Sequence, residues 1–480
     1  MWMTRSWSLL TALASLILNG HASAQMQLND AGSQDPLARF SSGIQPGCAE
    51  GVFGPGRSHS YRAAGYADVA ASIPITPKTQ FLVASMSKQF TALSIVMLAD
   101  RRRLSLDDPA RRWVPELAGA VGDATIDQLL HHTAGVRDHV NLLMLAGVEK
   151  LGDVDREATL RLMSMQRRTN FPPGTRAQYS NGNYFVLAEI VSRVSGMPLG
   201  RFAEREIFRP LHMRRTSFLG AGTSRDLAQG YQPAGGPGEF SIANDRPSTN
   251  GSGGLITTIA DLRKFDADFR ARRVVWRPEI LNRMLTPGRL NDGGIAVLPE
   301  FGTPYGMGLG LAQTGPETLV FHDGGAEGFR AEYARLLDAG ISAAVLCNRV
   351  DAPAPAIARR ALGFTQPPGA AGGERPAGQR EIPPASLLKN MAGVFRAAEI
   401  ETEYRFEPNG DGFKVTVTSS YARGTAPVED WNGFRADPDG VLISGPIRIQ
   451  GVESASVAQR LQLSFGARVE GLELERVPDQ

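Results

Sequence analysis

Strand-like segments stand at both ends of a long helical stretch, and this arrangement limits the folds open to the chain. Apolar or alternating runs between turn residues predict strands at 46–53 and 57–68, and again at 317–325, 330–338 and 341–349. Helical patterns lie between these two groups, at 85–100, 181–198 and 259–272. The sequence therefore predicts an α/β domain whose single sheet is built from distant chain segments, with a helical region inserted.

A segment dense in glycine and proline divides the chain. Residues 366–384, "QPPGAAGGERPAGQREIPP", are typical of a linker. The segment after it, 385–480, begins with a short helical pattern and continues as alternating runs, with Asn409-Gly410 as a strong hairpin signal. With 480 residues, two domains are expected. We predict a larger domain over 25–365 and a small all-β domain, a barrel or meander, over 385–480.

The first residues have the order of a secretory signal peptide. Arg5 precedes a short apolar run from Trp7 to Leu18, and the small residues Ala22-Ser23-Ala24 follow. The run is too short to span a bilayer comfortably, and no other segment has eighteen consecutive apolar residues. We therefore predict that residues 1–24 are removed and that the mature chain is secreted or periplasmic, without a membrane span.

Charge and composition exclude several classes of function. A formal charge of +2 and the lack of a Lys/Arg stripe argue against a nucleic-acid partner. The seven histidines show no HExxH or HxH spacing, so no metal site is expected. Cys48 and Cys347 are too far apart for a CxxC motif. Buried thiols are the default interpretation, with one bridge open in an oxidising compartment.

A serine three residues before a lysine is the first candidate for chemistry. On a helix these residues share a face, so Lys88 can bring its amine to the Ser85 hydroxyl. A serine hydroxyl is a poor nucleophile until a neighbouring base takes its proton. The same spacing recurs in Ser386 and Lys389, but no accompanying motifs follow that pair. We interpret the second pair as surface residues of a helix.

Two further motifs follow along the chain. Tyr179 and Asn181 stand between a Pro/Gly turn and a helical pattern, where a tyrosine can carry a proton and an amide can hold a substrate group. His322-Asp323-Gly324 ends an apolar strand, and Gly324-Gly325 permits close approach of a substrate to the backbone. Each motif alone is weak evidence, because polar loop residues and histidines at strand ends are usually structural.

Together, the order Ser-x-x-Lys, Tyr-x-Asn, His-x-Gly resembles the serine β-lactamase and penicillin-binding superfamily. It is most similar to the class C β-lactamase-related branch that includes esterases, DD-carboxypeptidases and D-aminopeptidases. The stretches "LLHHTAGV", "GSGGLITTIADLRKF" and "YGMGLGL" also resemble that branch, so the likeness covers about residues 40 to 350.

The resemblance implies an antiparallel sheet flanked by helices and an acyl-enzyme on Ser85. Lys88 and Tyr179 would share the proton transfers, Asn181 would hydrogen-bond the substrate amide, and the N–H groups of Ser85 and Gly325 would form the oxyanion hole. His322 and Gly324 would also contact the substrate. The resemblance implies no metal or organic cofactor. It also places the first strand beside the last, which brings Cys48 near Cys347 as packed thiols or as one bridge, and we favour thiols.

The third motif departs from that of β-lactamases, which carry Lys-Thr-Gly. A lysine gives a fixed positive charge near a substrate carboxylate, whereas His322 would change its charge near pH 6.5. We therefore predict an exported serine hydrolase of small peptides, amides or esters, with peptidase (D-aminopeptidase-like) or esterase activity. β-Lactamase or DD-carboxypeptidase activity is the alternative. A β-lactamase-like sensor or assembly protein is the non-enzymatic alternative.

Overall fold

The chain forms an α/β domain followed by an all-β domain in a computed structural model, which describes residues 37–478 apart from 56–59, 221–225, 244, 248–250, 365–380, 423–428, 432, 438 and 453–456. The predicted signal peptide and most of the predicted linker therefore lie outside the described residues. Within these residues, no helix has the length and apolar character needed to cross a bilayer.

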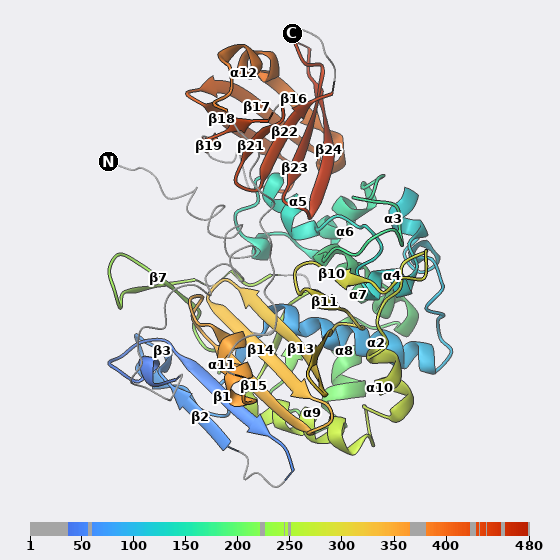
Figure 1. The fold of residues 1–480 in the computed structure, drawn as a ribbon, viewed down its shortest axis with the longest axis vertical. Helices are drawn as coiled ribbons and strands as arrows, with labels where there is room; N and C mark the ends of the chain where they lie inside the picture. The colour runs from blue at the N-terminus through green and yellow to red at the C-terminus, as the bar shows by residue number, and fades with distance from the viewer. Residues whose placement is uncertain are drawn as a thin grey trace.

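The main sheet has six antiparallel strands and joins the two ends of the larger domain (Figure 1). Its order is β12 (Gly310–Thr314), β13 (Glu317–Ala326), β14 (Phe329–Leu336), β15 (Ile341–Cys347), β1 (Cys48–Phe53) and β2 (Ser60–Ala64). β1 pairs with β15 along its whole length, from Cys48↔Cys347 to Phe53↔Ser342. This confirms the prediction of one sheet built from distant segments.

Alternation along β15 explains how the sheet is covered on both faces. Ala343 and Val345 pack with Ile357 of α11 (Ala354–Ala361), whereas Ala344 and Leu346 join the main core on the other face. Successive strand residues point to opposite faces, so a run that is apolar throughout requires a helix on each side. Figure 1 shows α11 in front of the sheet and α2 (Lys88–Asp100), α8 (Leu199–Ala203) and α9 (Ile259–Ala271) behind it.

The inserted region supplies the remaining helices and short strands. The helices are α3 (Gly119–Asp123), α4 (Ile126–Leu130), α5 (His139–Leu145), α6 (Arg156–Ser164), α7 (Asn181–Ser195) and α10 (Pro278–Met284). Short ladders pair β3 (Tyr66–Asp68) with β4 (Ile73–Pro74), β7 (Tyr231–Pro233) with β8 (Phe240–Ile242), and β10 (Val297–Leu298) with β11 (Thr303–Pro304). A three-stranded group consists of β5 (Phe81–Leu82), β9 (Leu255–Thr257) and β6 (Ser217–Phe218).

In the residues that the structure describes, the C-terminal domain begins with helix α12 (Ala385–Met391) and continues as a curled sheet. Its strands, in spatial order, are β19 (Glu429–Trp431), β18 (Gly412–Ser419), β17 (Thr402–Asn409), β16 (Gly393–Ala397), β24 (Val469–Arg476), β23 (Arg460–Phe465), β22 (Ile447–Gly451), β21 (Leu442–Ser444) and β20 (Arg435–Ala436). The predicted hairpin is present, since Asn409 pairs with Gly412 and Gly410 has a φ of +61°.

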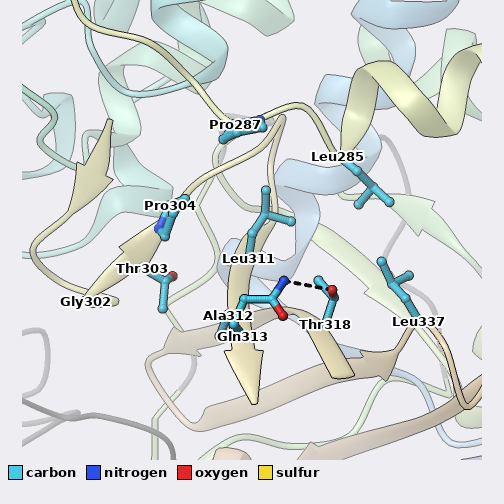
Figure 2. Close-up of a pocket in the computed structure, with 10 residues that line it drawn as sticks. All are labelled: Leu285, Pro287, Gly302, Thr303, Pro304, Leu311, Ala312, Gln313, Thr318 and Leu337. Atoms are coloured by element: carbon cyan, nitrogen blue, oxygen red, sulfur yellow. Dashed lines mark hydrogen bonds between the residues drawn. The ribbon is translucent and has the colours of Figure 1, made fainter. Parts of the chain in front are cut away.

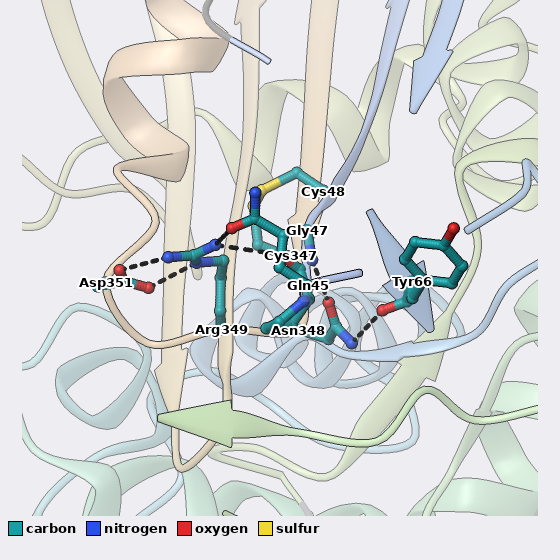
Figure 3. Close-up of a disulfide and its surroundings, with 9 residues drawn as sticks. Gln45, Gly47, Cys48, Tyr66, Cys347, Asn348, Arg349 and Asp351 are labelled. Carbon is teal, nitrogen blue, oxygen red and sulfur yellow. Dashed lines mark hydrogen bonds and ion pairs between the residues drawn. A yellow bond between two sulfur atoms is a disulfide. The ribbon is translucent and has the colours of Figure 1, made fainter. Parts of the chain in front are cut away.

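The two cysteines form a disulfide, so the preference for free thiols was wrong. Cys48 and Cys347 are fully buried register partners on β1 and β15, and their sulfur atoms are bonded (Figure 3). The next residue, Asn348, reinforces the junction: it accepts a hydrogen bond from Gly47 N and donates to Tyr66 O. The bridge and this amide therefore hold the same end of the sheet.

Opening the disulfide should lower stability without changing the fold. The bridge spans 299 residues, and closing so long a loop constrains the unfolded chain strongly. We expect the double variant Cys48→Ser, Cys347→Ser to lose about 2–4 kcal/mol of unfolding free energy. Urea titrations of the variant, and of the parent with and without reductant, measure the loss. Equal midpoints, or two titratable thiols in the non-reduced denatured parent, would contradict the bridge.

Candidate active site

The predicted nucleophile lies in a tight turn that leads into α2. Ser85 belongs to a 3₁₀ turn, Ala84–Ser87, and Ala84 before it has a φ of +45°, a conformation that side chains rarely adopt. The Ser87 hydroxyl fixes this turn, because it donates to Ala84 O and accepts from Leu255 N on β9. The backbone therefore presents Ser85 at the entrance to the buried helix.

Lys88 directs one of its three hydrogen-bonding positions at the serine. Its Nζ lies 3.0 Å from Ser85 Oγ, 2.8 Å from Asn181 Oδ1 and 2.7 Å from the Ser252 carbonyl. An amide oxygen and a carbonyl oxygen can only accept, so they take two amine hydrogens. The third position faces Ser85, and in a neutral amine it is the lone pair. This geometry suits a base for the serine proton.

Burial favours the neutral form of this amine. Lys88 is fully buried, and the loss of hydration lowers its pKa well below the usual range. The carboxylates of Asp138 and Asp323 oppose this shift, whereas the Arg468 guanidinium adds to it. The Lys88 amine is therefore easier to deprotonate than a lysine in water.

Tyr179 completes the trio around the serine. Its hydroxyl is hydrogen-bonded to Ser85, and its ring lies 4.7 Å from Lys88 Nζ. Burial raises the pKa of Tyr179 well above its ordinary value, although the hydrogen bond to Ser85 and the charge of Arg468 act in the opposite direction. The phenol is therefore neutral at working pH and can donate a proton.

Asn181 and Asp138 form the support behind Lys88. Asp138 caps α5 by accepting from Val140 N, and its other oxygen accepts from both Asn181 N and Asn181 Nδ2. These bonds leave Asn181 Oδ1 directed at the lysine. Asp138 is completely buried and was not predicted from the sequence. In this arrangement Asn181 orients Lys88, and its predicted contact with a substrate amide stays a prediction.

The third motif lies on an open strand edge beside the serine turn. β12 pairs with β13 only as far as Phe321, so residues 322–326 keep one edge free. A Cβ on Gly324 would approach Val83 O to 2.2 Å, so only glycine allows β13 to lie against the serine turn. Gly325 is exposed on this edge. The role of the Gly325 N–H in an oxyanion hole remains a prediction. The exposed position of Gly325 on this edge suits that role.

His322 does not titrate as expected. Its side chain is fully buried, Nδ1 donates to the Asp323 carbonyl, and Nε2 accepts from the Tyr305 hydroxyl at 3.0 Å. Burial lowers its pKa to about 4, against the opposing charge of Asp323. The expectation of a charge change near pH 6.5 was therefore wrong, and His322 stays neutral from pH 6 to 8.

Buried histidines should make the protein sensitive to acid. The pKa values of His139 and His322 are about 4 because of burial, whereas an unfolded histidine titrates near 6.5. As pH falls, the unfolded chain binds these protons first, so the stability present above pH 6.5 is lost between about 6.5 and 4. Each histidine contributes up to about 3 kcal/mol of unfolding free energy above pH 6.5.

We expect the urea midpoint to fall steeply from pH 7 to 4.5, with a smaller slope in His322→Asn. Parallel slopes in the two proteins would contradict this assignment.

The C-terminal domain reaches this site, which the sequence did not indicate. Arg468, in the turn between β23 and β24, has its guanidinium 5.0 Å from the Tyr179 ring centre and 3.7 Å from Asp138 Oδ2. The Arg468 carbonyl accepts from Asp138 N at 3.1 Å. The ion pairs Arg137–Glu399, Arg168–Glu473 and Arg176–Glu470 join the two domains around this turn.

Two other candidate sites lie elsewhere. Ser386 and Lys389 are exposed on α12 of the C-terminal domain, as expected for surface residues. A cavity of about 580 Å³ lies beside edge strand β12 and is lined by Leu285, Leu311 and Leu337 among others (Figure 2). None of its lining residues is a predicted site residue. Among the residues that the structure describes, no group of three His, Cys, Asp or Glu side chains is placed to hold a metal ion.

The sequence of this chain is similar to those of known proteins. The model of the family described as Beta-lactamase matches residues 37–365. A D-aminopeptidase from Cereibacter sphaeroides is 30% identical over 358 residues, covering 72% of this chain and 65% of the relative. A D-aminopeptidase from Brucella anthropi is 27% identical over 303 residues, covering 63% of this chain and 56% of the relative. The match thus spans about two thirds or less of the length of these relatives.

Solved structures show the same fold. The octameric penicillin-binding protein homologue from Pyrococcus abyssi aligns with a TM-score of 0.58 at 23% identity, over 97% of this chain and 99% of that one. The D-amino acid amidase from Ochrobactrum anthropi SV3, solved with L-phenylalanine amide, aligns with a TM-score of 0.55 at 21% identity. The alignment covers 72% of this chain and 99% of the amidase.

Proposed function

Because this chain belongs to the β-lactamase family, we propose that it is a serine hydrolase that cleaves amide bonds through an acyl-enzyme on Ser85. The observation that carries the proposal is the 3.0 Å contact between Lys88 Nζ and Ser85 Oγ, with both hydrogens of the neutral amine already engaged by Asn181 Oδ1 and the Ser252 carbonyl. A serine beside a buried amine is an activated nucleophile.

The geometry suits a two-stage reaction. Ser85 Oγ attacks the substrate carbonyl while its proton passes to Lys88, and the N–H groups of Ser85 and Gly325 hold the developing oxyanion. A proton from Tyr179 or Lys88 reaches the leaving amine as the C–N bond breaks. Water then attacks the Ser85 ester with the same groups acting in reverse. One water is consumed, and an acid and an amine are released.

For the substrate, we propose an amide of a D-amino acid with a free amino group. The names of the relatives, D-aminopeptidase and D-amino acid amidase, support this class. The rim of the site also supports it. Asp323 has a carboxylate 38% exposed and 3.8 Å from His322 Nδ1, where β-lactamases carry the threonine after their motif lysine. A carboxylate favours an ammonium group over a second carboxylate.

A panel of matched substrates tests this proposal. D-Phenylalanine amide should be hydrolysed faster than its L-isomer, its N-acetyl derivative, a short acyl ester and a chromogenic cephalosporin. Asp323→Asn should reduce the advantage of the free amine over the N-acetyl form, and the exposed Asp292→Asn serves as the control. Equal rates for the two enantiomers, or faster cephalosporin hydrolysis, would contradict the substrate class.

Export is a second proposal. The order of charged, apolar and small residues over 1–24 supports it, and so does the disulfide, which persists in oxidising compartments. The N-terminus of the mature protein, determined by mass spectrometry after expression in a Gram-negative host, should follow Ala24. An intact Met1 in the cytoplasmic fraction would contradict it.

A further inference from the structure

The third motif lacks the fixed cation found at this position in β-lactamases. His322 is buried and neutral, so the strand that bears it brings no positive charge to the serine. Asp323, the next residue, adds a negative charge instead. Burial already lowers the proton affinity of Lys88, and a cation that offsets the negative charge of Asp323 has to come from another part of the chain.

The C-terminal domain provides one at the required place. The Arg468 side chain is only 16% exposed, and its guanidinium is 5.0 Å from the Tyr179 ring centre. Two backbone contacts fix the turn that carries it, because the Arg468 carbonyl accepts from Asp138 N and from Asn170 Nδ2. The docking of the C-terminal domain against the larger domain therefore fixes the position of Arg468.

Several charged or titratable groups surround Lys88 and Tyr179, and their signs determine what Arg468 does. They are Asp138 ahead of α5, Asp323 and His322 on β13, His132, Tyr184 on α7, and Tyr305. The two carboxylates favour a charged lysine, whereas Arg468 opposes them and lowers the pKa of both Lys88 and Tyr179. Without Arg468, the buried carboxylate of Asp138 would act unopposed by this cation and would raise the pKa of Lys88.

We propose that the C-terminal domain completes the active site and that Arg468 is its positioning residue, holding the positive charge that keeps the proton acceptor of Ser85 in its basic form. Arg468 acts through Asp138, Lys88 and Tyr179 rather than by bonding the reacting atoms. The inference rests on the proposed acyl-enzyme chemistry at Ser85. The charge of Arg468 acts on Lys88 and on Tyr179 in the same direction, but only the buried Lys88 amine is brought towards its basic form at working pH.

The test is the pH dependence of Ser85 modification in the full-length protein. Rates of labelling by a fluorophosphonate are measured from pH 5 to 9 for the parent, Arg468→Gln and Arg468→Ala. In both variants Ser85 should be labelled about 10- to 100-fold more slowly at the acid end of this pH range. The rising limb of the plot of labelling rate against pH should move to higher pH. Arg468→Lys, which keeps the charge, should return the limb towards the parent.

Two matched controls separate charge from docking. Arg448→Ala removes an exposed arginine from the same domain, and Arg168→Ala removes a domain-joining ion pair that does not involve Arg468. Neither control variant should move the rising limb of the labelling profile.

An unmoved limb in folded Arg468→Gln would overturn the inference, and so would an equal shift of the limb in Arg168→Ala. If D-phenylalanine amide is not cleaved although Ser85 labels, only the substrate class fails. A parent that never labels at Ser85 refutes the proposed function and this inference with it.

Discussion

Replacing Ser85 with alanine should abolish both amide hydrolysis and covalent labelling by a fluorophosphonate. In the proposed reaction the Ser85 hydroxyl forms the ester intermediate, and the Lys88 amine and the Tyr179 phenol lie beside it, where they can move its proton. Removing the nucleophile of a serine hydrolase lowers kcat on the order of 10⁶-fold. Intact-mass spectrometry after labelling, together with steady-state kinetics, measures both effects.

Ser386→Ala is the matched control for this experiment. Ser386 precedes Lys389 by the same three residues, but both side chains are exposed on α12 of the other domain. Labelling of this variant should equal that of the parent. A label on Ser386, or continued labelling of Ser85→Ala, would contradict the assignment of the nucleophile.

Lys88→Ala should lower kcat by about 10²–10⁴, the usual contribution of a general base. The substitution also removes a buried side chain whose amine satisfies the Asn181 amide oxygen and the Ser252 carbonyl. Lys88→Met, which fills the space without a base, separates the two effects. Both variants should lose activity and leave the two acceptors unsatisfied, and Lys88→Ala should lose more stability because it also leaves a cavity.

The control is Lys389→Ala, which should leave kcat unchanged because the side chain is exposed in the C-terminal domain. Circular dichroism and urea titration establish that each variant is folded. Retention of more than a tenth of the activity in folded Lys88→Met would assign the base to Tyr179 instead.

Local patterns in the sequence, together with the family resemblance, predicted the fold and named the candidate chemical groups. The runs around Cys48 and Cys347 were predicted as strands, the resemblance placed them side by side, and they pair in the structure. The spacing of Ser85 and Lys88 placed both at the start of one helix, and the structure joins them by a hydrogen bond. These features depend on residues close in the chain or on a pattern that burial requires.

Features that depend on distant contacts could not be predicted. Asp138, Ser252 and Arg468 meet around Lys88 from three separate segments, and none of them was assigned a role at the site from the sequence. Ser252 lies in one of the stretches that resemble the family, and Asp138 precedes an apolar helical run, which indicates only a helix cap. The low pKa of His322 comes from burial by Tyr305 and neighbouring rings, which a strand pattern does not reveal.

The pairing of β1 with β15 also constrains how the chain can fold during its synthesis. The strand made first lies between β2 and β15 in the finished sheet, and its bridge partner Cys347 is 299 residues away. At a ribosomal rate of about 5–20 residues per second, that partner appears roughly 15–60 s later. Until then one edge of β1 is an unpaired apolar strand, which is a template for aggregation. We expect nascent chains arrested before residue 341 to bind chaperones, and chains released beyond residue 349 to escape them.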